Sequence, residues 1–284
     1  MQMQVGVVDV GSNTIRLLVA RVGRDGMVPL EKERVRLSLG AEIERTGVVS
    51  DVSIAAAAKA VGKLCARARR RGVDSLDVFL TAPGRQSENA DELVAALGRA
   101  AAHSVRVLST DEEGRLAYAG AVATAELPLP GTVAVCDVGG ASTEIAVGAP
   151  EDEPAWVRSV DLGSVRLAAR DDQATEAAAA FSAIAPPRVD VALAVGGSAR
   201  AARRLVGPEL GQVELAKALQ IVETTSERAI SRRYGVHKSR AAIVGAGVEL
   251  LAEVQRLLGV PLHVCTGGIR EGAVLATVRA LRAA

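Results

Sequence analysis

The feature that most constrains the fold of this chain is an internal repeat. A short apolar strand that ends in an aspartate and a glycine-containing loop occurs twice, as VGVVDVGSNT at residues 5–14 and as TVAVCDVGGAST at residues 132–143. Almost half of the 284 residues separate the two copies. An apolar run, a polar turn and an alternating run follow each copy, which is the pattern of antiparallel hairpins. The sequence therefore predicts two halves built on the same plan.

Each half continues with a helical stretch and further apolar strands. Strands that alternate with helices in this way predict a mixed sheet covered by helices. We expect an α/β protein in which each half is a mixed five-stranded sheet flanked by helices. The expected later elements are helices at 52–71 and 172–185 and strands at 77–81, 105–108, 189–195 and 261–266.

The segment ELPLPG at 126–131 interrupts the pattern and predicts a domain boundary. We expect an N-terminal domain at 1–125 and a C-terminal domain at 126–284, with the last helix packing back on the first domain. The second half is the longer one, because a long segment of mostly helical pattern lies between Gly197 and Pro261.

Composition excludes several classes of protein. The chain has 34 basic and 33 acidic residues, which argues against a general nucleic-acid binder, and its five aromatic rings cannot form a base-stacking groove. No apolar run is long enough to span a membrane, and the N-terminus lacks the pattern of a signal peptide. The three cysteines are far apart and lack zinc-ligand spacing. We expect a cytoplasmic protein without disulfides.

The two loops have the residues of a phosphate site. In DVGSNT, a strand delivers Asp9 to its end, Gly11 permits a tight turn, and the next three residues offer hydroxyl, amide and backbone donors. Such a loop can wrap an anion while the aspartate holds a cation or its bound water. Glycine, asparagine and serine are also common in tight turns for conformational reasons alone. That two loops of this kind occur at matching places favours the phosphate interpretation.

The paired loops resemble those of the acetate and sugar kinase/Hsp70/actin superfamily. More narrowly, VVDVGSNTIRLLV, DEEGRLAYAGA, CDVGGASTEIAV, DLGSVRL, AVGGSAR and CTGGIREG resemble, in that order, the exopolyphosphatase/guanosine pentaphosphatase (Ppx/GppA) phosphatase family. The resemblance runs over nearly the whole chain and fits the short, two-domain form of that family. It implies two actin-like (RNase H-like) domains, each with a phosphate loop facing a cleft.

The resemblance also implies roles for individual residues. Glu113, in DEEGR, matches the catalytic glutamate that positions or deprotonates the attacking water. Asp137 and Glu144 match the carboxylates around a divalent metal, Mg²⁺ or Mn²⁺, with Asp9 as a further ligand. The implied phosphate-binding residues are Gly11, Ser12, Asn13, Thr14, Arg85, Gly139, Gly140, Ala141, Ser142 and Thr143. Further contacts to the chain or to a nucleotide are expected from Arg16, Arg115, Arg166, Gly196, Gly197 and Ser198.

Some residues leave alternatives open. Thr110 and Glu113 fit a capping box, so Glu113 has a structural interpretation beside the catalytic one. Ala141 stands where the family usually has a third glycine, and Pro83-Gly84 replaces small or apolar residues, which changes how far Arg85 reaches.

The function that these residues predict is metal-dependent hydrolysis of the terminal phosphoanhydride of inorganic polyphosphate. The alternatives are hydrolysis of guanosine pentaphosphate, an ATP-using kinase or ATPase of the same superfamily that binds ADP or ATP, and a non-catalytic sensor of polyphosphate or nucleotides. We expect no nucleic-acid or membrane partner, and we expect a homodimer.

Overall fold

The computed structural model describes residues 2–24 and 26–283 and shows two compact units. Unit 1 comprises Met1–Leu116 and Arg270–Ala284, and unit 2 comprises Ala117–Ile269. The division falls inside helix α5 (Thr110–Val122), whereas the sequence places it at 126. The reason is packing, because Ala117, Tyr118 and Ala121 of α5 are buried with apolar residues of the unit 2 sheet.

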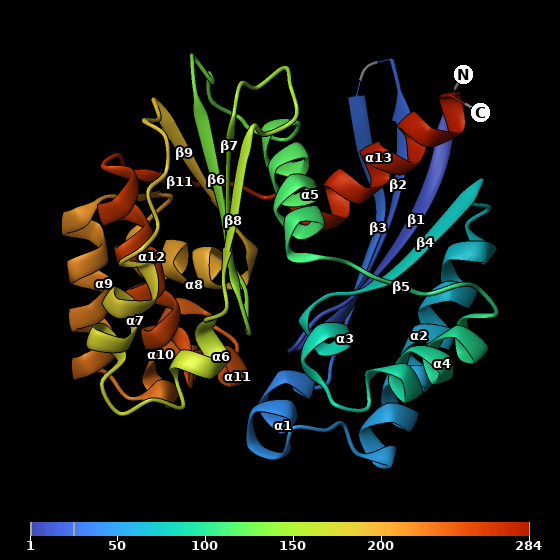
Figure 1. Cartoon of the computed structure of the whole chain (residues 1–284), viewed down its shortest axis with the longest axis horizontal. Helices are drawn as coiled ribbons and strands as arrows, with labels where there is room; N and C mark the ends of the chain where they lie inside the picture. Colours follow the sequence, from blue (N-terminus) through green and yellow to red (C-terminus); the bar gives the residue numbers. More distant parts are fainter. Residues whose placement is uncertain (1, 25, 284) are drawn as a thin grey trace. The chain divides into compact units, whose positions relative to one another are not determined.

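Unit 1 contains a mixed five-stranded sheet, as the sequence predicts (Figure 1). Its strand order is β3-β2-β1-β4-β5. The β1-β2 and β2-β3 pairs are antiparallel, whereas β4 runs parallel to β1 and β5 runs parallel to β4. The strands are β1 (Met3–Val10), β2 (Thr14–Gly23), β3 (Gly26–Arg36), β4 (Ser75–Leu80) and β5 (Arg106–Val107).

Helices cover both faces of this sheet, and successive side chains of β1 point to opposite faces. Val8 and Val10 are buried in a core with residues of α2 and α4. Side chains of the opposite parity lie on the face of α13, where Ser75 and Asp77 of β4 line a pocket together with Thr277. The helices of unit 1 are α1 (Leu39–Thr46), α2 (Asp51–Arg70), α3 (Ala82–Gln86), α4 (Ala90–Ala101), the first turns of α5 and nearly all of α13 (Ile269–Ala283).

Unit 2 contains a six-stranded mixed sheet of order β10-β11-β9-β6-β7-β8. The expectation of five strands is therefore wrong for this half, because Glu209 and Leu210 pair with β11 as a sixth strand. Gly207, with φ of 108°, and Pro208 end the preceding helix and let the chain extend. The strands are β6 (Val133–Val138), β7 (Thr143–Gly148), β8 (Trp156–Val160), β9 (Val191–Val195), β10 (Glu209–Leu210) and β11 (Leu262–Val264).

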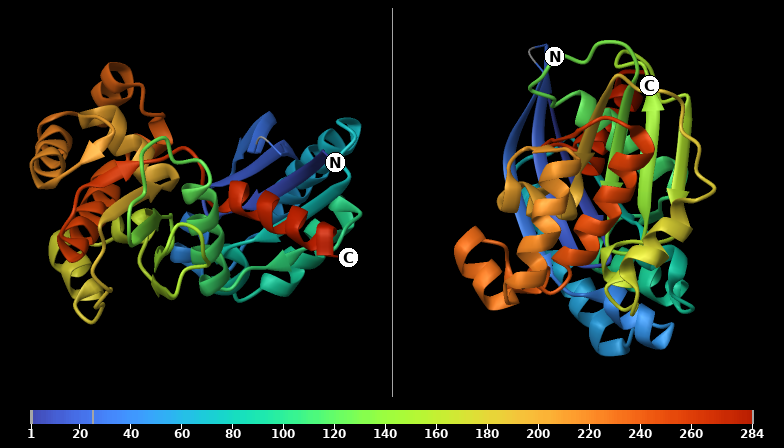
Figure 2. Two further views of the ribbon diagram at one scale, coloured as in Figure 1. Left: turned by 90° about the horizontal axis from the view of Figure 1, so that it is seen from above. Right: turned by 90° about the vertical axis from the view of Figure 1, so that its left-hand side faces the viewer.

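A layer of helices covers one face of the unit 2 sheet, and the last turns of α5 cover the other. The segment from α8 to α12 contributes most of that layer, drawn in gold to orange-red in Figure 2. The helices are α6 (Ser164–Leu167), α7 (Gln173–Phe181), α8 (Gly196–Val206), α9 (Gln212–Thr224), α10 (Glu227–Tyr234), α11 (Lys238–Ala241) and α12 (Val244–Leu258).

The structure also bears on the cysteines and on membrane spans. Cys65, Cys136 and Cys265 are buried free thiols. Among the described residues, no helix combines the length and the apolar character that crossing a membrane requires.

Candidate functional site

The first loop, residues 11–14, connects the antiparallel strands β1 and β2. The amide of Gly11 donates to the carbonyl of Thr14 at 3.0 Å and closes the turn. The amide of Gly40, in the first turn of α1, donates to the carbonyl of Ser12 at 2.7 Å and fixes the loop from outside. Arg16 lies beside the loop, because its Nε donates to Thr14 Oγ1 at 2.9 Å.

The second loop, residues 139–143, repeats this construction in unit 2. The amide of Gly139 donates to the carbonyl of Ser142 at 3.0 Å. The first turn of α6 fixes this loop, because the amides of Ser164 and Val165 donate to the carbonyls of Gly139 and Gly140 at 3.0 and 2.8 Å. The Cβ of Ala141 is accommodated, since that residue is buried.

In both loops most of the carbonyl groups accept a hydrogen bond while several amide groups donate none. Within the described part of the chain, the amides of Ser12 and Asn13 donate no hydrogen bond, and neither do those of Gly140 and Ala141. Successive backbone N–H groups of this kind form anion-binding concavities. Each unit therefore has a loop suited to phosphoryl oxygens.

The structure separates the two interpretations of Glu113. The capping box at the start of α5 is formed by Ser109 and Glu112, because Glu112 Oε2 accepts from the Ser109 amide at 2.8 Å and Ser109 Oγ accepts from the Glu112 amide at 3.2 Å. The hydrogen bonds from Ser109 lower the pKa of Glu112, as expected for a capping carboxylate. Glu113 is therefore not needed as the cap.

Glu113 instead forms an ion pair with Arg85. Arg85 Nη2 lies 2.8 Å from Glu113 Oε2, and the Glu113 side chain is buried. Arg85 Nη1 also donates to the carbonyl of Leu108 at 2.5 Å. The short helix α3, with Pro83 in its first turn, positions this arginine, so the Pro83-Gly84 departure still lets Arg85 reach Glu113.

Backbone hydrogen bonds place this pair at the carboxyl end of the parallel strands. The amide of Thr81 donates to the carbonyl of Val10, where β1 leads into the first loop, and the amide of Leu108 donates to the carbonyl of Leu80. The first loop and the start of α5 therefore lie at one edge of the unit 1 sheet, where ligand sites of α/β sheets are common.

Asp9 is a buried carboxylate on the α13 face of the same sheet, one position before the end of β1. Burial raises its pKa, while the positive charges of Arg16 and Arg270 act in the opposite direction and the negative charge of Glu271 acts with burial. The register pairs Asp9 with Arg16 of β2.

Asp137 and Glu144 are cross-strand partners on β6 and β7 and lie on one face of the unit 2 sheet. Ser159 Oγ donates to Glu144 Oε1 at 2.9 Å and orients that carboxylate. Among the described residues, no group of three or more histidine, cysteine, aspartate or glutamate side chains forms a metal site. Two carboxylates still suit Mg²⁺, which is commonly held by one or two carboxylates together with waters and substrate phosphates. The donor set of this face therefore fits a divalent ion.

The start of α8 closes around Asp137. Gly196 has φ of 86°, and a Cβ there would lie 2.1 Å from Asp137 Oδ1, so only glycine fits this position. Ser198, in the same turn, is buried, and its Oγ has no hydrogen-bond partner within the described part of the chain. Of the expected residues, Gly196 thus lies against the carboxylate of Asp137, and Gly197 and Ser198 follow it in the same turn.

Arg240 of α11 is a candidate site residue that the sequence analysis missed. Its Nη1 donates to Ser164 Oγ at 3.2 Å, and its Nη2 lies 2.5 Å from where a Cβ on Gly197 would be. The guanidinium is therefore next to both the α8 start and the turn that fixes the second loop. No sequence signal pointed to it, because it lies in a helical segment far from every loop motif.

Two of the expected arginines are engaged in exposed ion pairs. Arg115 pairs with Asp111 one helical turn away at 2.6 Å, and Arg166 pairs with Asp161 at 2.6 Å. Pairs of this kind contribute little to stability and rearrange at low cost.

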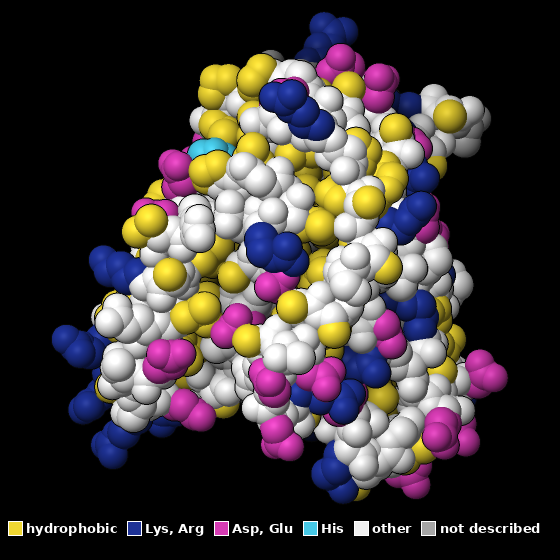
Figure 3. All heavy atoms as spheres, turned by 60° about the vertical axis from the view of Figure 1, so that its left-hand side comes forward, with side chains coloured by type: hydrophobic (Ala, Val, Ile, Leu, Met, Phe, Trp, Pro, Cys, Tyr) yellow, Lys and Arg dark blue, Asp and Glu magenta, His cyan; other side chains and the backbone are white. Residues whose placement is uncertain are grey.

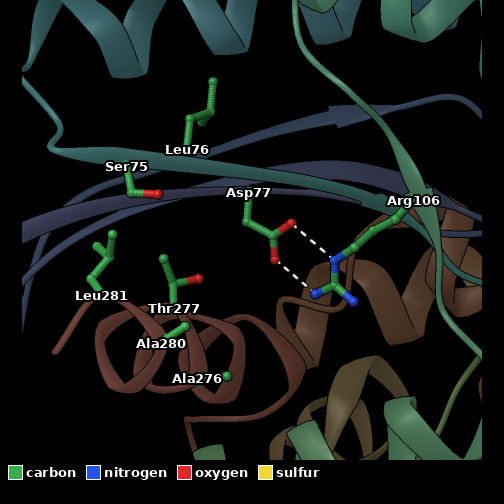
Figure 4. Close-up of a pocket in the computed structure, with 8 residues that line it drawn as sticks. All are labelled: Ser75, Leu76, Asp77, Arg106, Ala276, Thr277, Ala280 and Leu281. Atoms are coloured by element: carbon green, nitrogen blue, oxygen red, sulfur yellow. Dashed lines mark hydrogen bonds and ion pairs between the residues drawn. The ribbon is translucent and has the colours of Figure 1, made fainter. Parts of the chain in front are cut away.

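A pocket of about 550 Å³ lies elsewhere in unit 1, between β4, β5 and α13 (Figure 4). Asp77 and Arg106 form a bidentate ion pair on its wall, with distances of 3.1 and 2.8 Å. None of the expected site residues lines this pocket.

Comparisons with known proteins identify the family of the chain. The model of the Ppx/GppA phosphatase family matches residues 18–185. Exopolyphosphatase 1 of Mycobacterium tuberculosis is 26% identical over 303 residues, which cover 96% of this chain and 88% of that protein. A guanosine-5'-triphosphate,3'-diphosphate pyrophosphatase of Pseudoalteromonas translucida is 29% identical over 161 residues, which cover 56% of this chain and 31% of that protein.

Solved structures share the fold. A Ppx/GppA family member of Aquifex aeolicus has a TM-score of 0.83 at 22% identity, and an exopolyphosphatase of Cytophaga hutchinsonii has a TM-score of 0.85 at 18% identity. Both alignments cover 98% of this chain and 98% of the other. They confirm the predicted fold of two actin-like domains.

Proposed function

Because the chain belongs to the Ppx/GppA phosphatase family, and its relatives are phosphoanhydride hydrolases, we propose that its substrate is inorganic polyphosphate and that it releases the terminal phosphate. The observation that carries the proposal is the buried Glu113, which does not serve as the helix cap and is paired with Arg85 beside the first loop.

Glu113 is the group that handles the attacking water. Its carboxylate orients a water molecule towards the terminal phosphorus and accepts one of its protons as the oxygen attacks. The bond between that phosphorus and the bridging oxygen breaks, and the shortened chain leaves with the negative charge. Arg85 holds the carboxylate in place through their 2.8 Å contact and presents positive charge to the phosphoryl oxygens.

The loop amides stabilise the charge that develops during transfer. In unit 1 these are the groups of Ser12 and Asn13, and in unit 2 those of Gly140 and Ala141. Preorganised backbone donors of this kind are effective because they need no reorientation as charge builds up.

Asp137 and Glu144 would hold a divalent ion, Mg²⁺ or Mn²⁺. When bound, the ion offsets negative charge on the phosphoryl oxygens. The hydrogen bond from Ser159 keeps the Glu144 carboxylate oriented for this role. The backbone of Gly196 lies against the Asp137 carboxylate and limits its movement.

The placement of aromatic side chains favours polyphosphate over guanosine pentaphosphate. A purine pocket is commonly lined by apolar and aromatic groups. Phe79, Tyr118 and Phe181 are fully buried in the cores, and Trp156 and Tyr234 pack against the apolar core of unit 2. An inorganic chain needs only donors and cations, which the loops and arginines supply.

The test is phosphate release by the full chain from polyphosphate, guanosine pentaphosphate and ATP, each with Mg²⁺ or with EDTA. We expect the highest kcat/KM for polyphosphate and no release in EDTA. A higher kcat/KM for guanosine pentaphosphate or for ATP would assign the site to that substrate instead. Release from none of the three would favour a non-catalytic sensor.

A further inference from the structure

A dense group of basic side chains in unit 2 lies outside the residues assigned to the reaction. Between residues 227 and 240 the chain has five basic residues and one acidic residue, Glu227, although the two charges nearly balance over the whole sequence. The last turn of α8 adds Arg203 and Arg204. We call the exposed members of this group the α10 surface; they are Arg203, Arg204, Arg228, Arg232, Arg233 and Lys238.

The positive charge of the α10 surface is not neutralised by the protein. Among the described residues, none of its six members forms an ion pair with an acidic side chain. The basic end of α2 behaves differently, because Arg67 and Arg71 both pair with the buried Glu31. Arg228 and Arg232 are one helical turn apart on α10, and like charges at this spacing are mildly unfavourable. A bound anion would relieve that repulsion.

Short segments of chain and two hydrogen bonds connect the α10 surface to the second loop. Lys238 is two residues before Arg240 on α11, and Arg240 donates to Ser164, whose amide donates to the carbonyl of Gly139. At the other end, Gly235 terminates α10, and its carbonyl accepts from Arg204 Nη1 at 2.8 Å. Basic side chains therefore follow one another from the turn that fixes the loop to the exposed helix α10.

Figure 3 shows several Lys and Arg side chains along the lower left edge of the face that it draws. We propose that the α10 surface binds the part of a long polyphosphate chain that extends beyond the second loop. This inference rests on the proposed function and adds a subsite for the distal phosphates. Five of the six side chains are arginines, whose planar guanidinium groups match phosphate oxygens in a bidentate geometry.

The same chemistry argues against a nucleic acid as the occupant. Single strands are bound by stacking their bases on aromatic side chains in addition to electrostatic contacts. Tyr234, at the end of α10, is partly buried against the core of unit 2 and offers no stacking platform. A linear anion without bases needs only the positive charges that this surface offers.

The experiment measures binding by the full chain carrying Glu113→Gln, so that the ligand is not consumed. The test variant adds Arg228→Gln, Arg232→Gln and Arg233→Gln. A control variant adds Arg70→Gln, Arg99→Gln and Arg279→Gln, three exposed arginines of unit 1 that give the same change in net charge. The probes are long-chain polyphosphate, tripolyphosphate and duplex DNA, measured over a range of salt concentrations.

We expect the test variant to bind long-chain polyphosphate about tenfold more weakly. The slope of the logarithm of the binding constant against the logarithm of the salt concentration should become shallower, by an amount that corresponds to about two lost phosphate contacts. Tripolyphosphate has only three phosphates, so we expect it to occupy the loops alone and to bind both variants equally well. The control variant should stay within twofold of its parent for every probe.

Three outcomes would overturn the inference: unchanged binding of the long chain, equal weakening for tripolyphosphate, or equal weakening in the control variant. Duplex DNA that binds as tightly as polyphosphate and weakens in parallel would reassign the surface to nucleic acid. If the triple substitution lowers the thermal midpoint, Arg232→Gln alone should still weaken binding about twofold. Failure of the proposed function is distinguished separately, because the wild-type chain would then release no phosphate from polyphosphate whatever the binding results.

Discussion

The two loops share a plan but differ in what holds them. Each follows a strand that carries an aspartate, and each is closed by a hydrogen bond from its glycine amide to the carbonyl three residues later. In unit 1, a Cβ on Gly11 would meet its nearest neighbours at 3.6 Å or more, whereas a Cβ on Gly40, which fixes the loop from α1, would lie 2.6 Å from Ser12 Cβ. In unit 2, a Cβ on Gly163 would lie 2.4 Å from the backbone of Gly140. Both loops are therefore approached closely by the element that fixes them, but the nearest atom is a side-chain atom in unit 1 and a backbone atom in unit 2.

The carboxylates around the two loops also differ. Unit 1 has the buried Asp9 and the Glu113–Arg85 pair, whereas unit 2 has two carboxylates in cross-strand register. The first arrangement suits proton handling, and the second suits a divalent ion. A duplicated scaffold therefore has two sets of groups with different chemistry, and the predictions below test that division of roles.

The largest expected effect concerns the proton-handling side. Glu113→Gln keeps the shape of the side chain but removes the base, so kcat for polyphosphate hydrolysis should fall by roughly 10²–10⁴. The matched control is the neighbouring residue, since Glu112→Gln keeps an acceptor for the Ser109 amide, loses only the charge at the helix N-terminus, and should lower stability by less than about 1 kcal/mol with little change in kcat. Steady-state kinetics and thermal unfolding of both variants make the test. A Glu113→Gln enzyme with more than a third of the wild-type rate would contradict the assignment.

The next effect concerns the metal side. Asp137→Asn removes one of two charged ligands, so the Mg²⁺ concentration for half-maximal activity should rise by about tenfold or more. Glu113→Gln should leave that concentration unchanged, because its loss acts on the water and not on the ion. Titrating activity with Mg²⁺ for each variant checks the division. A parallel shift in both variants would show that the two carboxylate sets do not act separately.

A smaller effect compares the packing of the loops. Gly163→Ala forces a Cβ into the backbone of the second loop and should cost about 1–3 kcal/mol in the free energy of unfolding. Gly11→Ala, where the contacts are ordinary, should change that free energy by less. Urea denaturation of the two variants measures the difference. Equal losses would mean that the first loop is as tightly fixed as the second.

How much of this was predictable depends on the range of the interactions. The hairpins, the two loops and the five-stranded sheet of unit 1 follow from local alternation and glycine-containing turns, and the sequence predicts them. Strand β10 is only two residues long and exists because it pairs with β11, which lies far along the chain. The boundary between the units falls inside α5 because Tyr118 is buried against the unit 2 sheet, and no local sequence pattern indicates which sheet will bury it.

The site was predictable to a similar degree. The loop residues and Glu113 are found through motifs, because they lie at strand ends and helix starts. Whether Glu112 or Glu113 forms the cap depends on a one-residue difference in where α5 begins, which sequence patterns do not resolve. Arg240 is brought to Ser164 by the packing of the α8–α12 helices, and its sequence neighbours give no indication of this.

The smallest expected effect is the contribution of Asp9 to the pH dependence of stability, which differs between a buried and a solvent-exposed carboxyl group. Burial raises the pKa of Asp9 above its ordinary value of 3.8, against the opposing charges of Arg16 and Arg270. The folded state therefore binds this proton more tightly than the unfolded state. The stabilisation that results is fully present below the unfolded pKa and is lost as pH rises through the folded pKa. Asp9→Asn removes the titration, so the stability of the variant relative to wild type should increase with pH over that window and then level off.

Urea denaturation of both proteins in EDTA, at a series of pH values from acidic to neutral, isolates this difference without a bound ion. Because the other acidic groups titrate in both proteins, their contributions cancel in the comparison. A difference that stays constant with pH would mean that Asp9 is solvated like a surface carboxylate. A difference that decreases with pH would mean that Arg16 and Arg270 outweigh burial, and the first loop would then begin at a stabilised anion.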